Sequence, residues 1–197
     1  MTRIAQRSRA DLAAFEPMLQ AVETAMGFVP NSFYTMAHWP DLLRTFSAFA
    51  GTVLGPSHVD PQLKQLVAYV ASQSAGCRYC QAHTAHTAER RGVANAKIEA
   101  AFRFDESPLF SAAERAALRL ASRAAAVPNE ATQADFDALG VHFGAREIAE
   151  IVAVVSLFGF LNRWNDTMAT TLEAAPAAFG AAHLQASGWG PDKHVGA

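Results

Sequence analysis

The spacing of apolar residues constrains the fold of this chain more than any other feature. Apolar side chains recur at intervals of three and four residues, alanine is abundant, and the alternating β-branched residues of strands are scarce. This pattern predicts an all-α fold. Hydrophobic residues make up 51% of the 197-residue sequence, which is enough to fill the core of one domain. We therefore predict a single domain over residues 1–197, with its core between about residues 11 and 180.

Proline, glycine and capping residues divide this pattern into segments. Pro17 is expected to kink or restart the first amphipathic helix, which Gly27 ends. Ser111 and Glu114 form a capping-box signature at the start of another helix. The expected helical segments are residues 11–26, 40–53, 61–74, the cysteine-bearing segment up to residue 90, 95–102, 111–126, 128–139, 145–158 and 162–174, with a short aromatic segment at 33–39. The tail over residues 185–197 is expected to be loosely ordered.

An internal repeat appears when the chain is shifted by 85 residues. Residues 64–68 then align with residues 149–153, and Cys77–Cys80 with Asn162–Asn165. Each segment has an arginine and an aromatic residue between its two key positions. The repeat predicts two helical hairpins, the first over residues 61–93 and a degenerate second one over residues 145–175.

The only two cysteines, Cys77 and Cys80, lie three residues apart in the first predicted hairpin. The N-terminal residues lack the apolar core of a signal peptide, so we expect a cytoplasmic protein. In that compartment a Cys-x-x-Cys pair indicates redox or metal chemistry more than a permanent disulfide.

Charge and hydropathy exclude several classes of partner. Charged residues make up 17% of the chain, and the formal net charge is −2, so neither nucleic acid nor an anionic membrane is an expected partner. The sequence contains no stretch of 18 or more apolar residues, so it predicts no membrane-spanning helix. The surplus of apolar residues suggests burial between subunits and hence a homo-oligomer.

The position of the cysteines favours thiol redox chemistry. Cys77 follows a glycine and is expected at the start of a helix, where backbone amides and neighbouring Arg78 would stabilise a thiolate. A thiolate attacks peroxides or disulfides, and a second cysteine nearby can resolve the resulting sulfenic acid into a disulfide. Spacing alone does not decide which cysteine attacks. His83, three residues after Cys80, is a candidate for proton exchange with it.

Other side chains near the cysteines are not expected to react with the substrate. His86 is expected in the second shell or on the surface, and Tyr79 in the core or an interface. Cys77, Cys80, His83 and His86 could be read as four zinc ligands, but three-residue steps along one helix turn by about 300° and do not bring all four together. We therefore expect no metal and no organic cofactor.

Around these residues the sequence resembles the alkylhydroperoxidase D / carboxymuconolactone decarboxylase superfamily, and most closely its peroxidase-related branch. The matching motifs are the apolar helix before Gly-Cys-Arg-Tyr-Cys at residues 76–80, the nearby histidine, Gly92-Val93, and further segments over most of residues 20–175. The resemblance implies an all-α, AhpD-like helical bundle that assembles as a trimer or hexamer. It also implies thiol-dependent reduction of a hydroperoxide, with Cys80 peroxidatic, Cys77 resolving, and an external dithiol as reductant.

Two positions depart from the pattern of the family's peroxidases. Those proteins usually carry a glutamate twelve residues before the first cysteine, where this chain has Gln65, which cannot exchange a proton near neutral pH. The family histidine lies four residues after the second cysteine, where this chain has Thr84. Proton transfer would then depend on His83, on His86 or on a group from elsewhere, such as Glu150 in the second repeat.

Three functions follow from these observations. The leading hypothesis is a Cys-x-x-Cys oxidoreductase that reduces organic hydroperoxides. The second is decarboxylation or isomerisation of a lactone-type acid, which does not need a cysteine pair. The third is a non-enzymatic, redox-responsive oligomeric binding protein, which the glutamine at position 65 favours.

Overall fold

The computed structural model describes residues 2–196, and the regular elements of this part of the chain are all helices, as the apolar spacing predicted. In chain order they are η1 (Ala10–Phe15), α1 (Glu16–Met26), α2 (Asn31–Met36), α3 (Pro40–Leu54), α4 (Pro61–Ser74), α5 (Arg78–Arg90), α6 (Asn95–Glu99), η2 (Ala101–Arg103), α7 (Ala112–Ala124), α8 (Gln133–Gly140), α9 (Ala145–Met168), α10 (Ala174–His183), η3 (Gln185–Ser187) and η4 (Asp192–His194), where η denotes a 3-10 helix.

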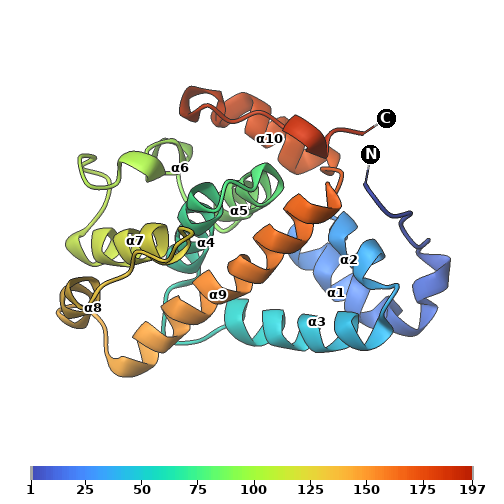
Figure 1. Ribbon diagram of the computed structural model, residues 1–197, viewed down its shortest axis with the longest axis horizontal. Coiled ribbons are helices and arrows are strands. Elements are labelled where there is room, and N and C mark those ends of the chain that lie inside the picture. The colour runs from blue at the N-terminus through green and yellow to red at the C-terminus, as the bar shows by residue number, and fades with distance from the viewer. Residues whose placement is uncertain (1, 197) are drawn as a thin grey trace.

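The long helix α9 crosses the middle of the molecule (Figure 1). It packs against α3 on one side and against α4, α5 and α7 on the other, and α10 lies over α5. The core between these helices is filled by aliphatic side chains that are almost fully buried, including Leu43, Leu66, Val67, Leu118, Ile151, Val154 and Leu157. The fold therefore surrounds the cysteine-bearing helix α5 with α4, α9 and α10.

Local sequence signals set several helix ends. Pro17 lies in the first turn of α1 and restarts the helix after η1, while Gly27 ends α1 with a φ of 86°. Asp60 caps α4 by accepting hydrogen bonds from the amides of residues 62 and 63. The expected capping box of Ser111 and Glu114 is present at the start of α7.

The predicted second hairpin over residues 145–175 is wrong, because α9 is one continuous helix from Ala145 to Met168. In the first hairpin Gly76 takes a φ of 75° and turns the chain between α4 and α5. The repeat places Leu161 at the corresponding position, and an L-residue with a side chain strongly disfavours that conformation. Gly159 nearby keeps a helical backbone, so the chain does not turn there.

The C-terminal region is also more ordered than predicted. Helix α10, Ala174–His183, follows the last predicted helical segment and was not predicted. Over the described part of the tail, Trp189 is buried and its indole donates to the carbonyl of Arg78, 3.0 Å away. His194 is completely buried, and its carbonyl accepts from the amide of Leu172. The tail thus packs across the start of α5, and the prediction that it is loosely ordered is wrong for its described residues.

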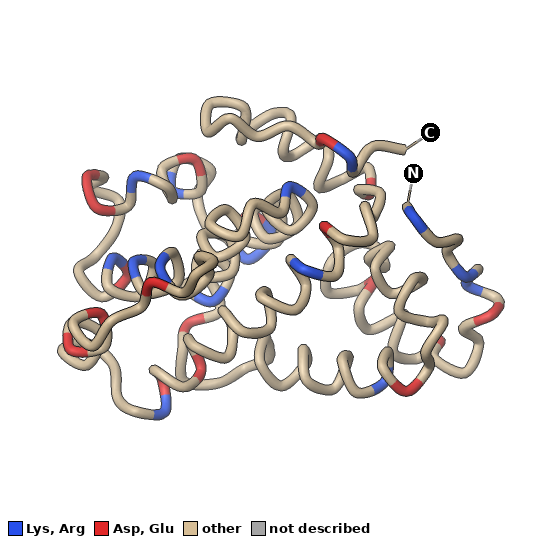
Figure 2. Tube along the Cα trace, in the orientation of Figure 1, with Lys and Arg blue, Asp and Glu red and all other residues tan. Residues whose placement is uncertain are grey.

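Acidic and basic residues are scattered over the helices without a single-sign stripe (Figure 2). Among the described residues, no helix is both long enough and apolar enough to cross a membrane.

Candidate active site

The two cysteines lie where α4 turns into α5. Cys77 has an extended backbone and is the N-cap of α5, and its sulfur accepts a hydrogen bond from the amide of Cys80 at 3.5 Å. Its predicted place at a helix start is therefore confirmed. Both thiols are free, and both are buried.

Cys80 is a protonated thiol in the resting protein. Burial raises the pKa of Cys80 well above its ordinary value, and the adjacent Cys77 raises it further. The side-chain amide of Asn165, which donates to the Cys80 sulfur at 3.6 Å, lowers this pKa in part. The start of a helix is therefore not enough to make Cys80 a thiolate, and a base must take its proton during reaction.

A cavity of about 440 Å³ gives access to Cys80. Its walls are mostly apolar and come from α1, α2, α3 and α9, with Met18, Val22, Met26, Phe33, Phe46, Ala50, Phe158 and Leu161 among the lining residues. Its polar wall holds Cys80, His83, Thr84, Gln65 and Asn165. Cys77 does not line this cavity. A molecule in the cavity can thus contact Cys80 and not Cys77.

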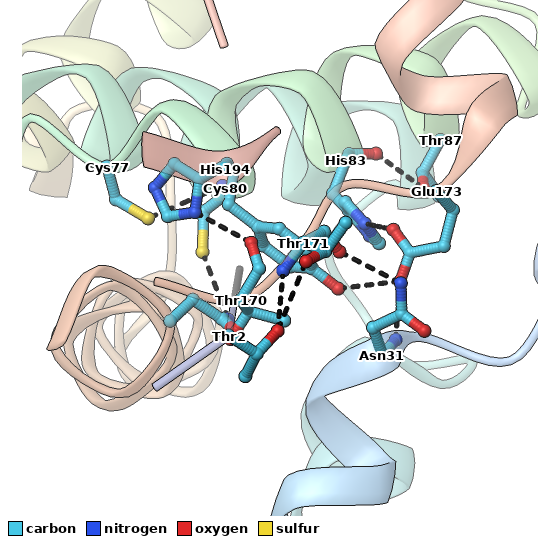
Figure 3. A network of polar contacts seen from close by, with 12 residues as sticks. Thr2, Asn31, Cys77, Cys80, His83, Thr87, Thr170, Thr171, Glu173 and His194 are labelled. Carbon is cyan, nitrogen blue, oxygen red and sulfur yellow. Dashed lines mark hydrogen bonds and ion pairs between the residues drawn. The ribbon is translucent and has the colours of Figure 1, made fainter. Parts of the chain in front are cut away.

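The side chains of His83 and Glu173 lie within ion-pair distance of each other (Figure 3). His83 lines the cavity. Nε2 of His83 lies 2.5 Å from the carboxylate, which also accepts from the Tyr79 hydroxyl at 2.9 Å and from the backbone amide of Asn31. Burial alone would raise the pKa of Glu173, but the charge and hydrogen bond of His83, with the amide of Asn31, hold it below its ordinary value. The ionised carboxylate orients the imidazole and can stabilise its protonated form.

Tyr79 belongs to the same group of side chains. Its ring stacks on His83 with 4.2 Å between centroids, and burial raises the pKa of its hydroxyl well above the ordinary value. The phenol therefore stays protonated and acts as a hydrogen-bond donor to Glu173. Its role is to hold the carboxylate and the imidazole in place.

Gln65 and Thr84, which replace the usual relay residues of the family, both line the cavity. The hydroxyl of Thr84 donates within its own helix, to the carbonyl of Cys80 at 2.7 Å and of Gln81 at 3.1 Å. Gln65 is buried and faces the cavity without a side-chain hydrogen bond within residues 2–196. Of the predicted proton-handling groups near Cys80, His83 alone lines the cavity with a carboxylate partner.

The structure does not place Glu150 or His86 with the thiols. The Glu150 carboxylate accepts hydrogen bonds from the Ser57 hydroxyl at 2.6 Å and from the amide of Val59, and it forms an ion pair with Arg146. These contacts, the one with Ser57 most of all, hold the pKa of Glu150 far below its ordinary value. Its role as a relay is therefore a wrong prediction. His86 packs between the rings of Phe28 and Phe179 and lies outside the cavity wall, as expected of a more distant residue.

The sequence did not identify Glu173 as a site residue, and it pointed to Asn165 only through the internal repeat. Glu173 lies 90 residues after His83, in a connection between two helices where no motif marks it. Asn165 did have a signal, since the 85-residue shift aligns it with Cys80, the residue to which it donates. The repeat therefore pointed to a spatial neighbour although it mispredicted the local fold.

Comparisons with known proteins agree with this architecture. The model of the carboxymuconolactone decarboxylase family matches residues 40–123, which include both cysteines. A solved peroxidase-related protein from Ralstonia eutropha JMP134, described as an alkylhydroperoxidase AhpD core, covers 89% of this chain and is covered to 94%, with a TM-score of 0.75 and 24% identity. The chain belongs to the carboxymuconolactone decarboxylase/AhpD-like family. At 24% identity, the Ralstonia structure supports the fold of this AhpD-like protein but not an activity or a substrate.

Two further relatives of this AhpD-like protein are more similar in sequence. The debrominase Bmp8 is 36% identical, with a TM-score of 0.84 over 88% of this chain and 94% of its own. A cysteine-to-alanine variant of Bmp8 has been solved in complex with 2,3,4-tribromopyrrole. The uncharacterised Escherichia coli protein YnjA is 31% identical over 112 residues, and the chain spans 62% of its length.

Proposed function

We propose that this AhpD-like protein is a dithiol oxidoreductase that reduces an apolar organic hydroperoxide at Cys80. The observation that carries the proposal is that a free thiol and a histidine lie together on the polar wall of a mostly apolar cavity, and that a buried carboxylate outside the wall pairs with this histidine. Cys80 is the attacking residue because it lines the cavity, and Cys77, its buried neighbour, is the resolving one. No cofactor is needed for this chemistry.

The reaction balances with the residues present and an external dithiol. His83 takes the proton of Cys80, and the thiolate attacks the outer peroxide oxygen, so that the O–O bond breaks. The departing alkoxide takes a proton back from His83 and leaves as an alcohol, while Cys80 becomes a sulfenic acid. Cys77 then displaces water to form the disulfide, and an external dithiol reduces this disulfide and restores both thiols.

Burial of Cys80 suits this sequence of events. A thiol that is protonated at rest is protected from nonspecific oxidation, and it becomes nucleophilic when His83 removes the proton in a dry cavity. The apolar walls favour an alkyl or aryl hydroperoxide over hydrogen peroxide, because burial of apolar substrate surface contributes about 25 cal/mol per Å².

The test is a stopped-flow reaction of pre-reduced protein with cumene hydroperoxide, followed by counting of free thiols. We expect rapid loss of two thiols per chain in the wild type, no loss of the remaining Cys77 thiol in Cys80→Ser, and accumulation of a dimedone-reactive sulfenic acid in Cys77→Ser. Consumption of the hydroperoxide at the wild-type rate by Cys80→Ser would contradict the proposal.

A second candidate is reductive debromination, which the likeness to Bmp8 at 36% identity favours. Cys80 would attack the bromine of a bromopyrrole, the ring carbon would take a proton, and Cys77 would displace bromide from the sulfenyl bromide to form the same disulfide. Incubation of the reduced protein with brominated pyrroles, with bromide release as the readout, separates this substrate class from the hydroperoxides. Release of one bromide per disulfide formed, with no reaction toward cumene hydroperoxide, would favour it.

A further inference from the structure

A second histidine–carboxylate group lies beside Cys77, outside the cavity wall. One ligand atom each from Cys77, His194 and Asp166 lie within 4.8 Å of one another, and Figure 3 shows the His194 imidazole beside the Cys77 sulfur. Neither His194 nor Asp166 lines the cavity of Cys80. The reaction proposed above uses Cys77 but assigns no role to His194 or Asp166.

The hydrogen bonds of His194 fix the state of its ring. Nδ1 lies 2.8 Å from the carbonyl of Thr170, which can only accept, so Nδ1 carries the hydrogen. In the neutral ring Nε2 is then a bare acceptor. The residue is completely buried, and Nε2 has no hydrogen-bond partner within residues 2–196. Burying a hydrogen-bond acceptor without a donor reduces the stability of the folded protein. The structure nevertheless keeps the unpaired Nε2 of His194 beside the Cys77 thiol.

We propose that His194 is the general base for Cys77, taking the thiol proton as Cys77 attacks the oxidised Cys80. This inference rests on the proposed function of the dithiol and assigns the base of its resolving step. Disulfide closure in a buried pair needs a thiolate at Cys77, and the unpaired nitrogen of His194 belongs to the cluster of side chains around that thiol, where it can accept the proton. The proton received by His194 balances the one that the departing oxygen takes up as water.

Asp166 is positioned to stabilise the charge that this step creates. Its Oδ1 lies 3.7 Å from Nε2 of His194, so an imidazolium at this place gains an ion pair that the neutral ring lacks. Burial lowers the pKa of His194, with Thr170 and Asp166 acting in the opposite direction, so the ring is neutral and ready to accept a proton at pH 7. The other charged or titratable groups facing the ring are Lys193, Asp192 and Tyr79.

The same three side chains could also be ligands of a divalent metal, but one contact favours proton transfer. The ammonium of Lys193 lies 2.9 Å from Oδ2 of Asp166, which leaves Oδ1 as the one carboxylate oxygen for a further contact. One oxygen is enough to accept from an imidazolium N–H, whereas a metal at this place would be bound beside the positive charge of Lys193. A thiol bound to a metal would also be withdrawn from disulfide formation.

The experiment measures closure separately from substrate oxidation. Cys80 is first converted to a mixed disulfide with 4,4′-dithiodipyridine, and attack by Cys77 then releases a second thiopyridone that is followed by absorbance. This readout does not depend on whether the protein reduces peroxides, so failure of the proposed function and failure of this inference are distinguishable. The variants are His194→Gln, which can still donate to Thr170, and Asp166→Asn, with exposed His142→Gln as the matched control.

We expect closure at pH 7 to slow by about 100-fold in His194→Gln and about tenfold in Asp166→Asn, with wild-type rates in His142→Gln. The rate in His194→Gln should rise with pH and approach that of the wild type in alkaline solution, because hydroxide can then take the place of the missing base. A purely structural role would slow closure equally at all pH values, and that result would overturn the proposal. Unchanged closure at pH 7, or stoichiometric zinc in the wild type that is lost in His194→Gln, would overturn it as well.

Discussion

Glu173 is the residue on which the polar contacts beside the cavity converge. It receives hydrogen bonds from His83, Tyr79 and the backbone of Asn31, three groups that α2 and α5 bring from different parts of the sequence. The carboxylate therefore links the proton-handling histidine to the fold. Cys77, Cys80 and His83 could be found from the sequence because they share one short motif, whereas Glu173 could not, because its partnership exists only in three dimensions.

We predict that Glu173→Gln slows the oxidation of Cys80 by roughly 100-fold, because His83 loses the charge that stabilises its protonated form. The same variant should lose about 1–3 kcal/mol of unfolding free energy at pH 7, since buried donors lose a charged acceptor. Stopped-flow oxidation and urea unfolding measure the two effects.

The pH dependence of this stability loss follows from the pKa of Glu173, which folding lowers from 4.5. A depressed carboxyl pKa contributes stability above about pH 4.5, and that contribution is lost as pH falls through the folded pKa. The difference in unfolding free energy between wild type and Glu173→Gln should therefore shrink between pH 5 and pH 3. A constant difference over this range would show that the charge of Glu173 is not what stabilises the fold.

Gln65 is the position at which the family's peroxidases usually carry a glutamate. It is buried, lines the cavity and makes no side-chain hydrogen bond within residues 2–196, so a carboxyl group there would face the substrate. We predict that Gln65→Glu increases the rate with cumene hydroperoxide by about tenfold, as an added proton relay. It should also reduce stability, because the new carboxyl is buried. Exposed Gln62→Glu on the same helix is the control, and a slower reaction in Gln65→Glu would argue against a relay at this position.

At the scale of elements, one glycine decides between a hairpin and a continuous helix. Gly76 turns the chain at the end of α4 and so makes Cys77 the N-cap of α5, whereas Leu161 at the repeated position lets α9 continue. The sequence therefore predicted the hairpin that holds the thiols, where the glycine is present. It mispredicted the second, because the similarity of the flanking residues concealed the absence of the turn residue.

This contrast predicts opposite effects of two glycine-to-alanine substitutions. An added methyl group meets no atom within 4 Å at Gly76 or Gly159, so backbone conformation alone decides the outcome. Gly76→Ala should reduce the unfolding free energy by about 1–2 kcal/mol, because it forces a left-handed conformation on alanine. Gly159→Ala should increase it by about 0.5–1 kcal/mol, because the site is helical. Urea unfolding of the pair checks both, and equal signs would contradict the argument.

At the scale of the whole molecule, the helices bring together groups that the sequence separates widely. The cavity takes its apolar wall from α1, α2, α3 and α9 and its reactive wall from α4 and α5, while the C-terminal tail supplies His194 beside Cys77, outside the cavity wall. Periodicity predicted that these helices exist. It could not predict which of them would meet, because helix packing depends on contacts between surfaces that one sequence does not reveal.

Assembly belongs to the same scale, and the expected homo-oligomer stays a prediction. Several large apolar side chains are exposed, with 81% of Val127, 76% of Val141 and 46% of Phe49 accessible. Because exposed apolar area is costly in water, we expect copies of the chain to cover part of it by associating as a trimer or hexamer. Size-exclusion chromatography with light scattering should give three or six times the chain mass of 21.1 kDa. A mass of one chain at micromolar concentration would contradict this expectation, and the cavity, which one chain builds alone, would then have to act in a monomer.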